Sequence, residues 1–213
     1  MLEKLLNATF ETFYLTFVSA ILIGIFGLIM GIILFISSPK QILENKYIYF
    51  VLNSFINTIR SIPFIILIIL LLPLTKILIG TILGVKGAIP ALVIGIAPVY
   101  AKLVETSLKE IPYGIIEAIK SCGASSFQII KKVLIPESLV SLILNFTNLL
   151  VSIIGYTAMA GIIGAGGLGN LAFIEGFQRN NYYITAYATL IILVLVFIVQ
   201  YIGELIAKTL NKR

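Results

Sequence analysis

The stretch FYLTFVSAILIGIFGLIMGIILFI, which runs from Phe13 to Ile36, contains no charged side chain. A helix needs about 20 mostly apolar residues to cross the hydrocarbon core of a bilayer, because each residue rises about 1.5 Å and the core is about 30 Å thick. A cleaved signal peptide has an apolar stretch of only about 7 to 15 residues. The stretch is therefore predicted to be a retained transmembrane helix.

Four more apolar stretches of similar length follow it, at about 47–72, 88–108, 138–160 and 184–207. The first of these four is the least regular, because apolar sequence continues past Pro73 to Ile79. Tilt, or an interfacial turn after Pro73, would take up the excess length. We predict an all-α integral membrane protein, a single domain over residues 1–213 with five transmembrane helices.

The composition agrees with a protein that uses a bilayer as its solvent. Apolar residues make up 60% of the chain and charged residues 11%, and the mean hydropathy is +1.12. The chain has no Asp or His, and Cys122 is its only cysteine. A Ser-His-Asp triad, a His or Cys metal cluster and an internal disulfide are therefore excluded. We expect no enzyme activity and no cofactor or metal bound by this chain.

The net charge of +6 reports the topology of the chain in the membrane. The basic residues stand at the ends of apolar runs, which does not fit a nucleic-acid surface. If the C-terminus is cytoplasmic, the inside segments hold Lys40, Lys46, Lys102, Lys109, Lys120, Lys131, Lys132, Lys208, Lys212 and Arg213, and the outside segments hold Lys4, Lys76, Lys86 and Arg179. Because basic residues concentrate on the cytoplasmic side, we expect the N-terminus outside and the C-terminus inside.

The connection at 109–136 is the longest inside segment and has helical periodicity of its own. Apolar residues recur at Ile111, Ile115, Ile116 and Ile119, and again at Phe127, Ile130, Val133 and Leu134. Gly123 interrupts the pattern and Pro136 ends it. Two short helices at the membrane surface are predicted, although any cytoplasmic loop can hold an amphipathic helix without further function.

This connection resembles the cytoplasmic EAA loop of ABC importer permeases. The resemblance is carried by Glu117-Ala118-Ile119, by Gly123 and by Val133-Leu134-Ile135-Pro136, with Ile119 in place of the second Ala of the consensus. It implies coupling helices that dock in a cleft of an ATPase subunit, through Glu110, Glu117, Ala118, Gly123, Ala124, Leu134 and Pro136. From their chemistry alone, Gly123 permits a positive φ, and Pro136 can open the next helix where its missing N–H costs nothing.

Two further stretches are similar to methionine-importer permeases. They are Arg60-Ser61-Ile62-Pro63-Phe64-Ile65-Ile66-Leu67 and Gly155-Tyr156-Thr157-Ala158-Met159-Ala160-Gly161, the latter followed by Gly164-Ala165-Gly166-Gly167-Leu168-Gly169. With five spans and the short length, this resemblance covers nearly the whole chain. The glycine-rich part is also similar to permeases for glycine betaine and phosphonates, so it does not identify a substrate.

Residues 164–169 also satisfy the dinucleotide fingerprint G-x-G-x-x-G. That fingerprint needs a strand before it, a helix after it and an acidic residue about 20 positions on. A membrane helix precedes it here, and no acidic residue lies near that offset. We interpret the segment either as a flexible external turn or as a gating hinge. The hinge residues would be Gly161, Gly164, Gly166, Gly167 and Gly169.

A polar stripe follows the fourth predicted span. Its members are Ser138, Ser141, Asn145, Asn148, Ser152, Tyr156 and Met159, which fall within a sector of roughly 80° on a helix. Such a stripe either lines a water-filled path or forms hydrogen bonds between helices. Asn145, Asn148, Ser152 and Tyr156 are predicted to line the pathway, and Met159 is predicted to form an outer constriction between two copies.

Asn53, Asn57 and Arg60 share one helical face of the second span. The simpler interpretation is that they satisfy neighbouring helices or the inner interface, with Arg60 extending toward water. Binding of a substrate carboxylate by Arg60 is the alternative.

The energy source must lie outside this chain, because no G-x-x-x-x-G-K-[ST] phosphate loop occurs in it. Five helices make a thin wall, whereas two copies can enclose a path between them. We predict a homodimeric permease in the bacterial cytoplasmic (inner) membrane, with two ATPase subunits that bind ATP and Mg and an external substrate-binding protein. Methionine, L or D, is the expected substrate by resemblance, with glycine betaine or phosphonate-type solutes as alternatives. A secondary carrier would be expected to place acids at the membrane midplane, but Glu105 lies near the inner end of a span.

Overall fold

The computed structural model describes residues 1–211, which form helices and no β-strand. The elements are α1 (Leu2–Ser37), α2 (Lys46–Ser61), α3 (Phe64–Ile79), α4 (Gly84–Lys109), α5 (Tyr113–Ser121), α6 (Ser126–Ile129), the π-type turn η1 (Ile130–Leu134), α7 (Ile135–Ala160), η2 (Gly161–Ala165), α8 (Gly167–Leu171), η3 (Ala172–Gln178) and α9 (Tyr182–Leu210). The prediction of an all-α fold is confirmed.

Helices α1, α4 and α7 form the centre of the bundle, and small residues bring the first two together. A Cβ on Gly31 of α1 would lie 2.5 Å from the Cβ of Val104, and one on Gly27 would lie 2.9 Å from the carbonyl oxygen of Ala97. Only glycine therefore fits at these two crossings. Close backbone approach of this kind is a common way for membrane helices to pack, since lipid supplies no hydrophobic drive between them.

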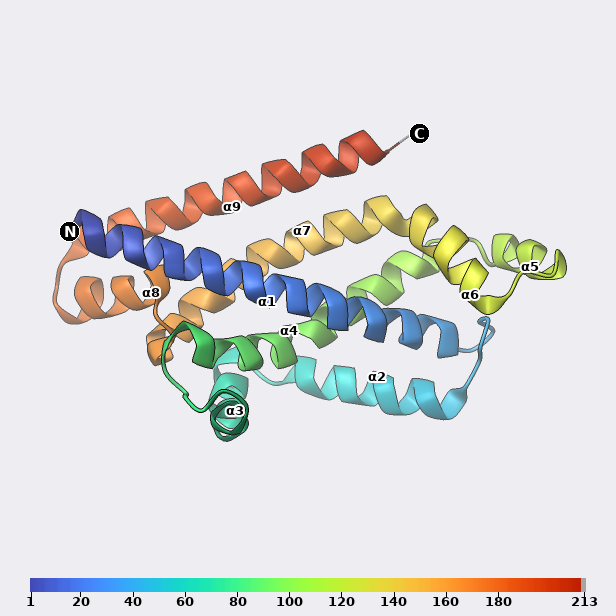
Figure 1. The fold of residues 1–213 in the computed structure, drawn as a ribbon, viewed down its shortest axis with the longest axis horizontal. Coiled ribbons are helices and arrows are strands. Elements are labelled where there is room, and N and C mark those ends of the chain that lie inside the picture. The colour runs from blue at the N-terminus through green and yellow to red at the C-terminus, as the bar shows by residue number, and fades with distance from the viewer. Residues whose placement is uncertain (212–213) are drawn as a thin grey trace.

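The bundle has two distinct ends (Figure 1). The N-terminus lies at the same end as α8, and the C-terminal end of α9 lies toward the end that carries α5 and α6. Four helices are long and apolar enough to cross a membrane, and the bent pair α2 and α3 would make a fifth crossing if it counts as one span. The described residues are thus compatible with five spans, and that number stays a prediction.

The second predicted span is broken, and the break does not lie after Pro73, where a turn was considered as the alternative to tilt. The chain bends by 112° between α2 and α3, at Ile62 and Pro63, whereas Pro73 lies inside α3. Ile62 has extended backbone angles, which the residue before a proline prefers. Pro63 then stands at the N-cap of α3, where a missing N–H has no cost. This break turns α3 away from the direction of α2.

Helix α1 begins eleven residues earlier than predicted, at Leu2 instead of Phe13. Its first turns are held by polar contacts with the segment after α7. The backbone N–H groups of Gly167 and Leu168 donate to the Glu11 carboxylate (2.7 Å) and the Thr12 hydroxyl (2.8 Å). These side chains satisfy backbone donors that the start of α8 leaves free.

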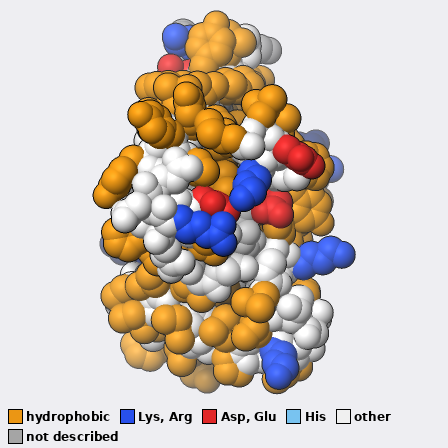
Figure 2. Space-filling view, turned by 90° about the vertical axis from the view of Figure 1, so that its left-hand side faces the viewer, with side chains coloured by type: hydrophobic (Ala, Val, Ile, Leu, Met, Phe, Trp, Pro, Cys, Tyr) orange, Lys and Arg blue, Asp and Glu red, His pale blue; other side chains and the backbone are white. Residues whose placement is uncertain are grey.

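A second contact ties the N-terminus to η3. The Lys4 ammonium lies 2.8 Å from the Glu175 carboxylate, and Arg179 pairs with the same carboxylate at 2.9 Å. Hydrogen bonding by Lys4, with the charge of Arg179, holds the pKa of the Glu175 carboxyl below its ordinary value, so the pairs remain charged at neutral pH. Figure 2 looks at this end and shows acidic and basic side chains gathered together, with hydrophobic side chains above and below them.

Helix α7 does not start from a loop. Pro136 is its second residue, as predicted, but Leu134 and Ile135 have helical backbone angles, and η1 joins α7 to α6. Together α6, η1 and α7 make one continuous helical segment from Ser126 to Ala160, and η2 extends it to a kink at Gly164. The backbone N–H of Ile135 bonds to the carbonyl of Ile130, five residues back, as in a π-type turn. The segment therefore links the end with α5 and α6 directly to the end with α8.

Candidate functional site

A groove of about 540 Å³ lies between the break of α2 and α3, the middle of α4 and the distal half of α7. It is lined by Ile59, Arg60, Ile62, Pro63, Phe64, Ile65, Leu67, Gly95, Ile96, Val99, Tyr156, Met159 and Ile162. The rings of Phe64 and Tyr156 have centroids 4.5 Å apart. The groove, called the translocation groove below, thus brings together the two sequence stretches, 60–67 and 155–161, that carry the resemblance to methionine-importer permeases.

The polar stripe of α7 divides into two parts. Near the α5 and α6 end, Asn145 donates from Nδ2 to Ser107 Oγ (2.9 Å), and the single Ser141 hydroxyl proton can be donated either to Ser107 Oγ (3.1 Å) or to the Glu110 carboxylate (3.3 Å). The buried Ser138 hydroxyl donates to the carbonyl of Leu134. In this half, therefore, Ser141 and Asn145 bond to the α4 end, while Ser138 bonds back within its own helical segment.

The distal half of the stripe is open. Asn148 and Ser152 are exposed, Met159 is 45% exposed, and Tyr156 is half-buried against Phe64. The side-chain amide of Asn148 makes no hydrogen bond within residues 1–211, unlike that of Asn145. Tyr156 and Met159 line the translocation groove, whereas Asn148 and Ser152 continue the same open face along α7. Their role as pathway and gate residues stays a prediction.

The three polar residues of α2 also separate. Asn53 accepts a hydrogen bond from the Lys102 ammonium at 2.9 Å, which is the packing role that the simpler interpretation assigned to it. Asn57 and Arg60 are exposed. Arg60 stands in the last turn of α2 and lines the translocation groove. The spacing of these three residues in the sequence places them on one helical face, but it does not show that Asn53 contacts α4 while Asn57 and Arg60 are exposed.

Helices α5 and α6 form the predicted pair of short helices, with Gly123 between them at φ +85°. A capping box begins α6, because Ser125 Oγ accepts from the Gln128 N–H (3.3 Å) and Gln128 Oε1 accepts from the Ser125 N–H (2.9 Å). Ile116 and Ile129 are buried against the bundle. The two helices are therefore fixed on one side and free on the other.

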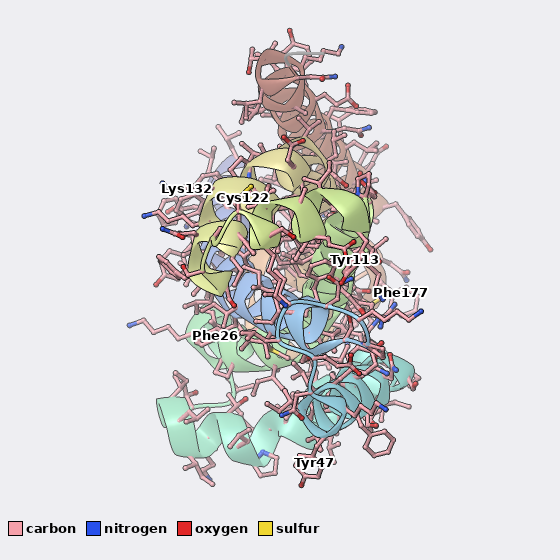
Figure 3. The ribbon with its side chains drawn as sticks, turned by 90° about the vertical axis from the view of Figure 1, so that its right-hand side faces the viewer. Phe26, Tyr47, Tyr113, Cys122, Lys132 and Phe177 are labelled. Carbon is pink, nitrogen blue, oxygen red and sulfur yellow. The ribbon has the colours of Figure 1, made fainter. Side chains whose placement is uncertain are left out.

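The free side is a second candidate site, the coupling surface, which Figure 3 views directly with Tyr113, Cys122 and Lys132 labelled. Of the predicted coupling residues, Glu110, Glu117, Ala118, Gly123 and Pro136 are exposed, Ala124 is half-buried and Leu134 is fully buried. Leu134 thus packs inside, so its contribution to coupling can only be indirect. Sequence analysis missed Tyr113 and did not expect Phe127 on this side, although they are 50% and 69% exposed. The available signal was that each of the two short helices has an aromatic residue in its first turn, off its buried face.

A buried carboxylate in α4 organises a cluster that joins the end of α4 to α2. Glu105 is 1% exposed and lies 2.6 Å from the ammonium groups of both Lys102 and Lys109. Lys102 in turn donates to Asn53 of α2. The cluster stands at the end of α4, directly before the chain enters the coupling loop at Glu110. A charge buried at this depth requires such partners, since desolvation of an isolated carboxylate is costly.

The glycine-rich segment is closely packed on its neighbours. Gly164, Gly166 and Gly167 have φ of +99°, +82° and +78°, which other L residues rarely adopt. A Cβ on Gly169 would lie 2.4 Å from the backbone of Ala158, and one on Gly161 would lie 2.5 Å from the Asn170 nitrogen. These contacts do not fit a loosely attached turn. A hinge at these five glycines stays a prediction, in which Gly164 and Gly166 supply the unusual backbone angles.

Comparison with known proteins agrees with this architecture. Residues 23–213 match the family described as the binding-protein-dependent transport system inner membrane component. The chain belongs to this family. It is therefore a permease subunit of an ABC importer, a non-catalytic membrane component, and ATP hydrolysis takes place on a partner subunit. The predictions of an ABC permease fold and of no enzyme activity are confirmed, and a secondary carrier is not favoured.

Individual relatives match along the whole permease. The methionine import system permease protein MetP of Bacillus subtilis (strain 168) is 52% identical, covering 100% of this chain and 96% of that protein. The probable D-methionine transport system permease protein MetI of Pasteurella multocida (strain Pm70) is 44% identical over 97% of this chain and 95% of its own. A solved structure of the MetNI methionine ABC transporter, described as inward facing, superposes with a TM-score of 0.97 at 37% identity, covering 100% of this chain and 98% of that chain.

Proposed function

We propose that this permease forms the path by which methionine, L or D, crosses the membrane in an ATP-driven importer. The translocation groove carries this proposal, because it joins Arg60 and Phe64 of the α2–α3 break to Tyr156 and Met159 of α7. The names of the relatives at 52% and 44% identity support methionine as the substrate. Glycine betaine and phosphonate-type solutes, the other substrates considered from the sequence, are not favoured by these names and serve as comparison solutes in an uptake assay.

The working assembly has two copies of the permease, two ATPase subunits and an external substrate-binding protein. One copy leaves the translocation groove and the distal stripe of α7 open on its side, so a second copy is needed to enclose a path. ATP and Mg bind to the ATPase subunits, and this chain binds no cofactor. The coupling surface then faces the cytoplasm, with the N-terminus outside and the C-terminus inside, in the bacterial cytoplasmic membrane.

Alternating access follows from the continuity of α6, η1 and α7. ATP draws the ATPase subunits together and displaces α5 and α6, which dock on them. Because residues 126–160 form one continuous helical segment, the displacement reaches Tyr156 and Met159 without crossing a loop. The outer ends of the two α7 helices separate, and hydrolysis restores the inward-open state.

Reconstitution of the complete complex in liposomes tests this function. With the external binding protein and ATP present, labelled methionine is expected to accumulate inside the vesicles, and methionine is expected to stimulate ATP hydrolysis. Accumulation of glycine betaine or a phosphonate instead of methionine would transfer the proposal to that solute. Uptake by the purified permease without an ATPase would contradict the whole assembly.

Met159→Ala is expected to raise the basal leak of methionine through the reconstituted complex about two- to tenfold, because its thioether side chain, 45% exposed on the groove, would form the outer constriction. Passive efflux from preloaded vesicles measures this leak. Leu190→Ala, which trims a 61% exposed side chain of α9 outside the groove, is the control and should leave efflux at the wild-type rate. Equal efflux from all three complexes would reject the gate.

A further inference from the structure

The translocation groove contains one charged side chain. Arg60 lines it together with the rings of Phe64 and Tyr156, and every other lining residue is apolar, glycine or proline apart from the Tyr156 hydroxyl. We propose that Arg60 binds the carboxylate of an α-amino acid substrate inside the permease. The inference rests on the proposed function and adds to it a substrate site on this chain, in addition to the site on the external binding protein.

Arg60 has no partner in the described part of the chain. The ion pairs among residues 1–211 join Lys4 and Arg179 to Glu175, and Lys102 and Lys109 to Glu105. No hydrogen bond within this range involves the Arg60 guanidinium. A charged side chain within a membrane span is costly unless it is paired or serves a path for solutes. A guanidinium offers two parallel N–H groups that match a carboxylate, so a carboxylate ligand is the natural partner.

The groove itself supplies no carboxylate to Arg60, because no acidic residue lines it. Helices α2 and α3 contain no acidic residue, and α7 contains only Glu137, in its first turn at the end opposite Met159. The remaining bordering helix, α4, contains Glu105, which is 1% exposed and already pairs with Lys102 and Lys109. The positive charge of Arg60 is therefore available to a ligand in the groove.

The rest of the groove suits an amino acid with an apolar, unbranched side chain. Leu67, Ile96 and Ile162 provide apolar walls, and Met159 adds a flexible thioether. Phe64 and Tyr156 also line the groove, with ring centroids 4.5 Å apart, and an aromatic face attracts an ammonium group within about 6 Å of its centroid. A volume of about 540 Å³ lies within the usual range of small-molecule sites, about 300 to 1,000 Å³.

Equilibrium dialysis of radiolabelled L-methionine against the purified permease–ATPase complex, without nucleotide and without the binding protein, tests the site. Methioninol, in which a hydroxymethyl group replaces the carboxylate, serves as competitor. In the wild-type complex, methioninol is expected to compete at least about tenfold more weakly than methionine, since hydrogen bonds to a charged partner contribute about 1.5 to 3 kcal/mol.

Arg60→Gln is expected to weaken methionine binding by a similar factor, about tenfold or more, and to bring the two competitors to within about twofold of each other. Arg60→Lys should retain part of the preference, because a lysine keeps the charge and loses the bidentate geometry. Lys76→Gln is the matched control, because it removes an exposed positive charge from α3 outside the groove and should leave both affinities at the wild-type values.

The outcomes separate the site from the function. Equal competition by methionine and methioninol in the wild-type complex overturns the site, even if the Arg60 variants fail to assemble. Absence of methionine binding by a complex that does import methionine with its binding protein also overturns the site and leaves the proposed function intact. If the complete complex imports no methionine, the proposed function fails and the site with it.

Discussion

Gly123→Asp is expected to lower the amount of methionine moved per ATP hydrolysed by about tenfold or more, because it places a carboxylate where α5 and α6 dock on the ATPase. The chain itself can accept this substitution. Gly123 has φ +85°, a region that Asp tolerates better than most residues, and its added Cβ would meet no atom within 4 Å. The effect should therefore arise at the partner's surface. Parallel measurement of uptake and ATP hydrolysis in proteoliposomes gives the ratio.

Gly80→Asp is the matched control for this variant. Gly80 also has a positive φ, +83°, and open space around its Cβ position, but it follows α3 far from the coupling surface. Its ratio of transport to hydrolysis should stay at the wild-type value. The two variants must be inserted in the membrane and assembled with the ATPase to equal levels. If Gly123→Asp then keeps the wild-type ratio of transport to ATP hydrolysis, the docking role of the turn is rejected.

Glu105→Ala is expected to destabilise the permease by about 3 to 5 kcal/mol, the usual cost of removing one partner from a buried ion pair. The carboxylate is 1% exposed, and its loss leaves the ammonium groups of Lys102 and Lys109 without their partner at 2.6 Å. Lys109 is 49% exposed and can turn toward water, which favours the lower end of that range. Thermal unfolding of the detergent-solubilised chain should show a Tm lower by several degrees.

The control is Glu175→Ala, which removes a carboxylate that also pairs with two basic side chains but lies nearer the surface. Its partners Lys4 and Arg179 are 57% and 64% exposed, so water can replace the lost carboxylate. The Tm should fall much less than in Glu105→Ala. Equal shifts for the two variants would show that burial of Glu105 does not make its pairs more important.

Much of the fold was predictable because membrane insertion depends on summed apolar length, which is a local property of the chain. The stretch at 13–36 lies inside α1, and the loop at 109–136 contains α5 and α6 with the turn at Gly123. The break at Pro63 was missed because mostly apolar sequence continues on both sides of it and hydropathy carries no information on direction. The N-terminal extension of α1 was missed because its charged residues interrupt the apolar stretch. Glu3, Lys4 and Glu11 lower its hydropathy, yet Lys4 and Glu11 bind the segment near α8.

By itself, the sequence determined that the chain is a membrane protein, which family it resembles and where its coupling loop lies, because these follow from composition and short motifs. Only the tertiary structure decided how the polar stripe of α7 is used. Asn145 and Asn148 have the same chemistry and belong to the same stripe, about 60° apart around the helix, but α4 covers one and leaves the other open. Likewise, Asn53 meets Lys102 while Arg60 meets no acidic group in the described chain. The function of a polar side chain in a membrane depends on what stands opposite it, and that is set by packing between distant segments.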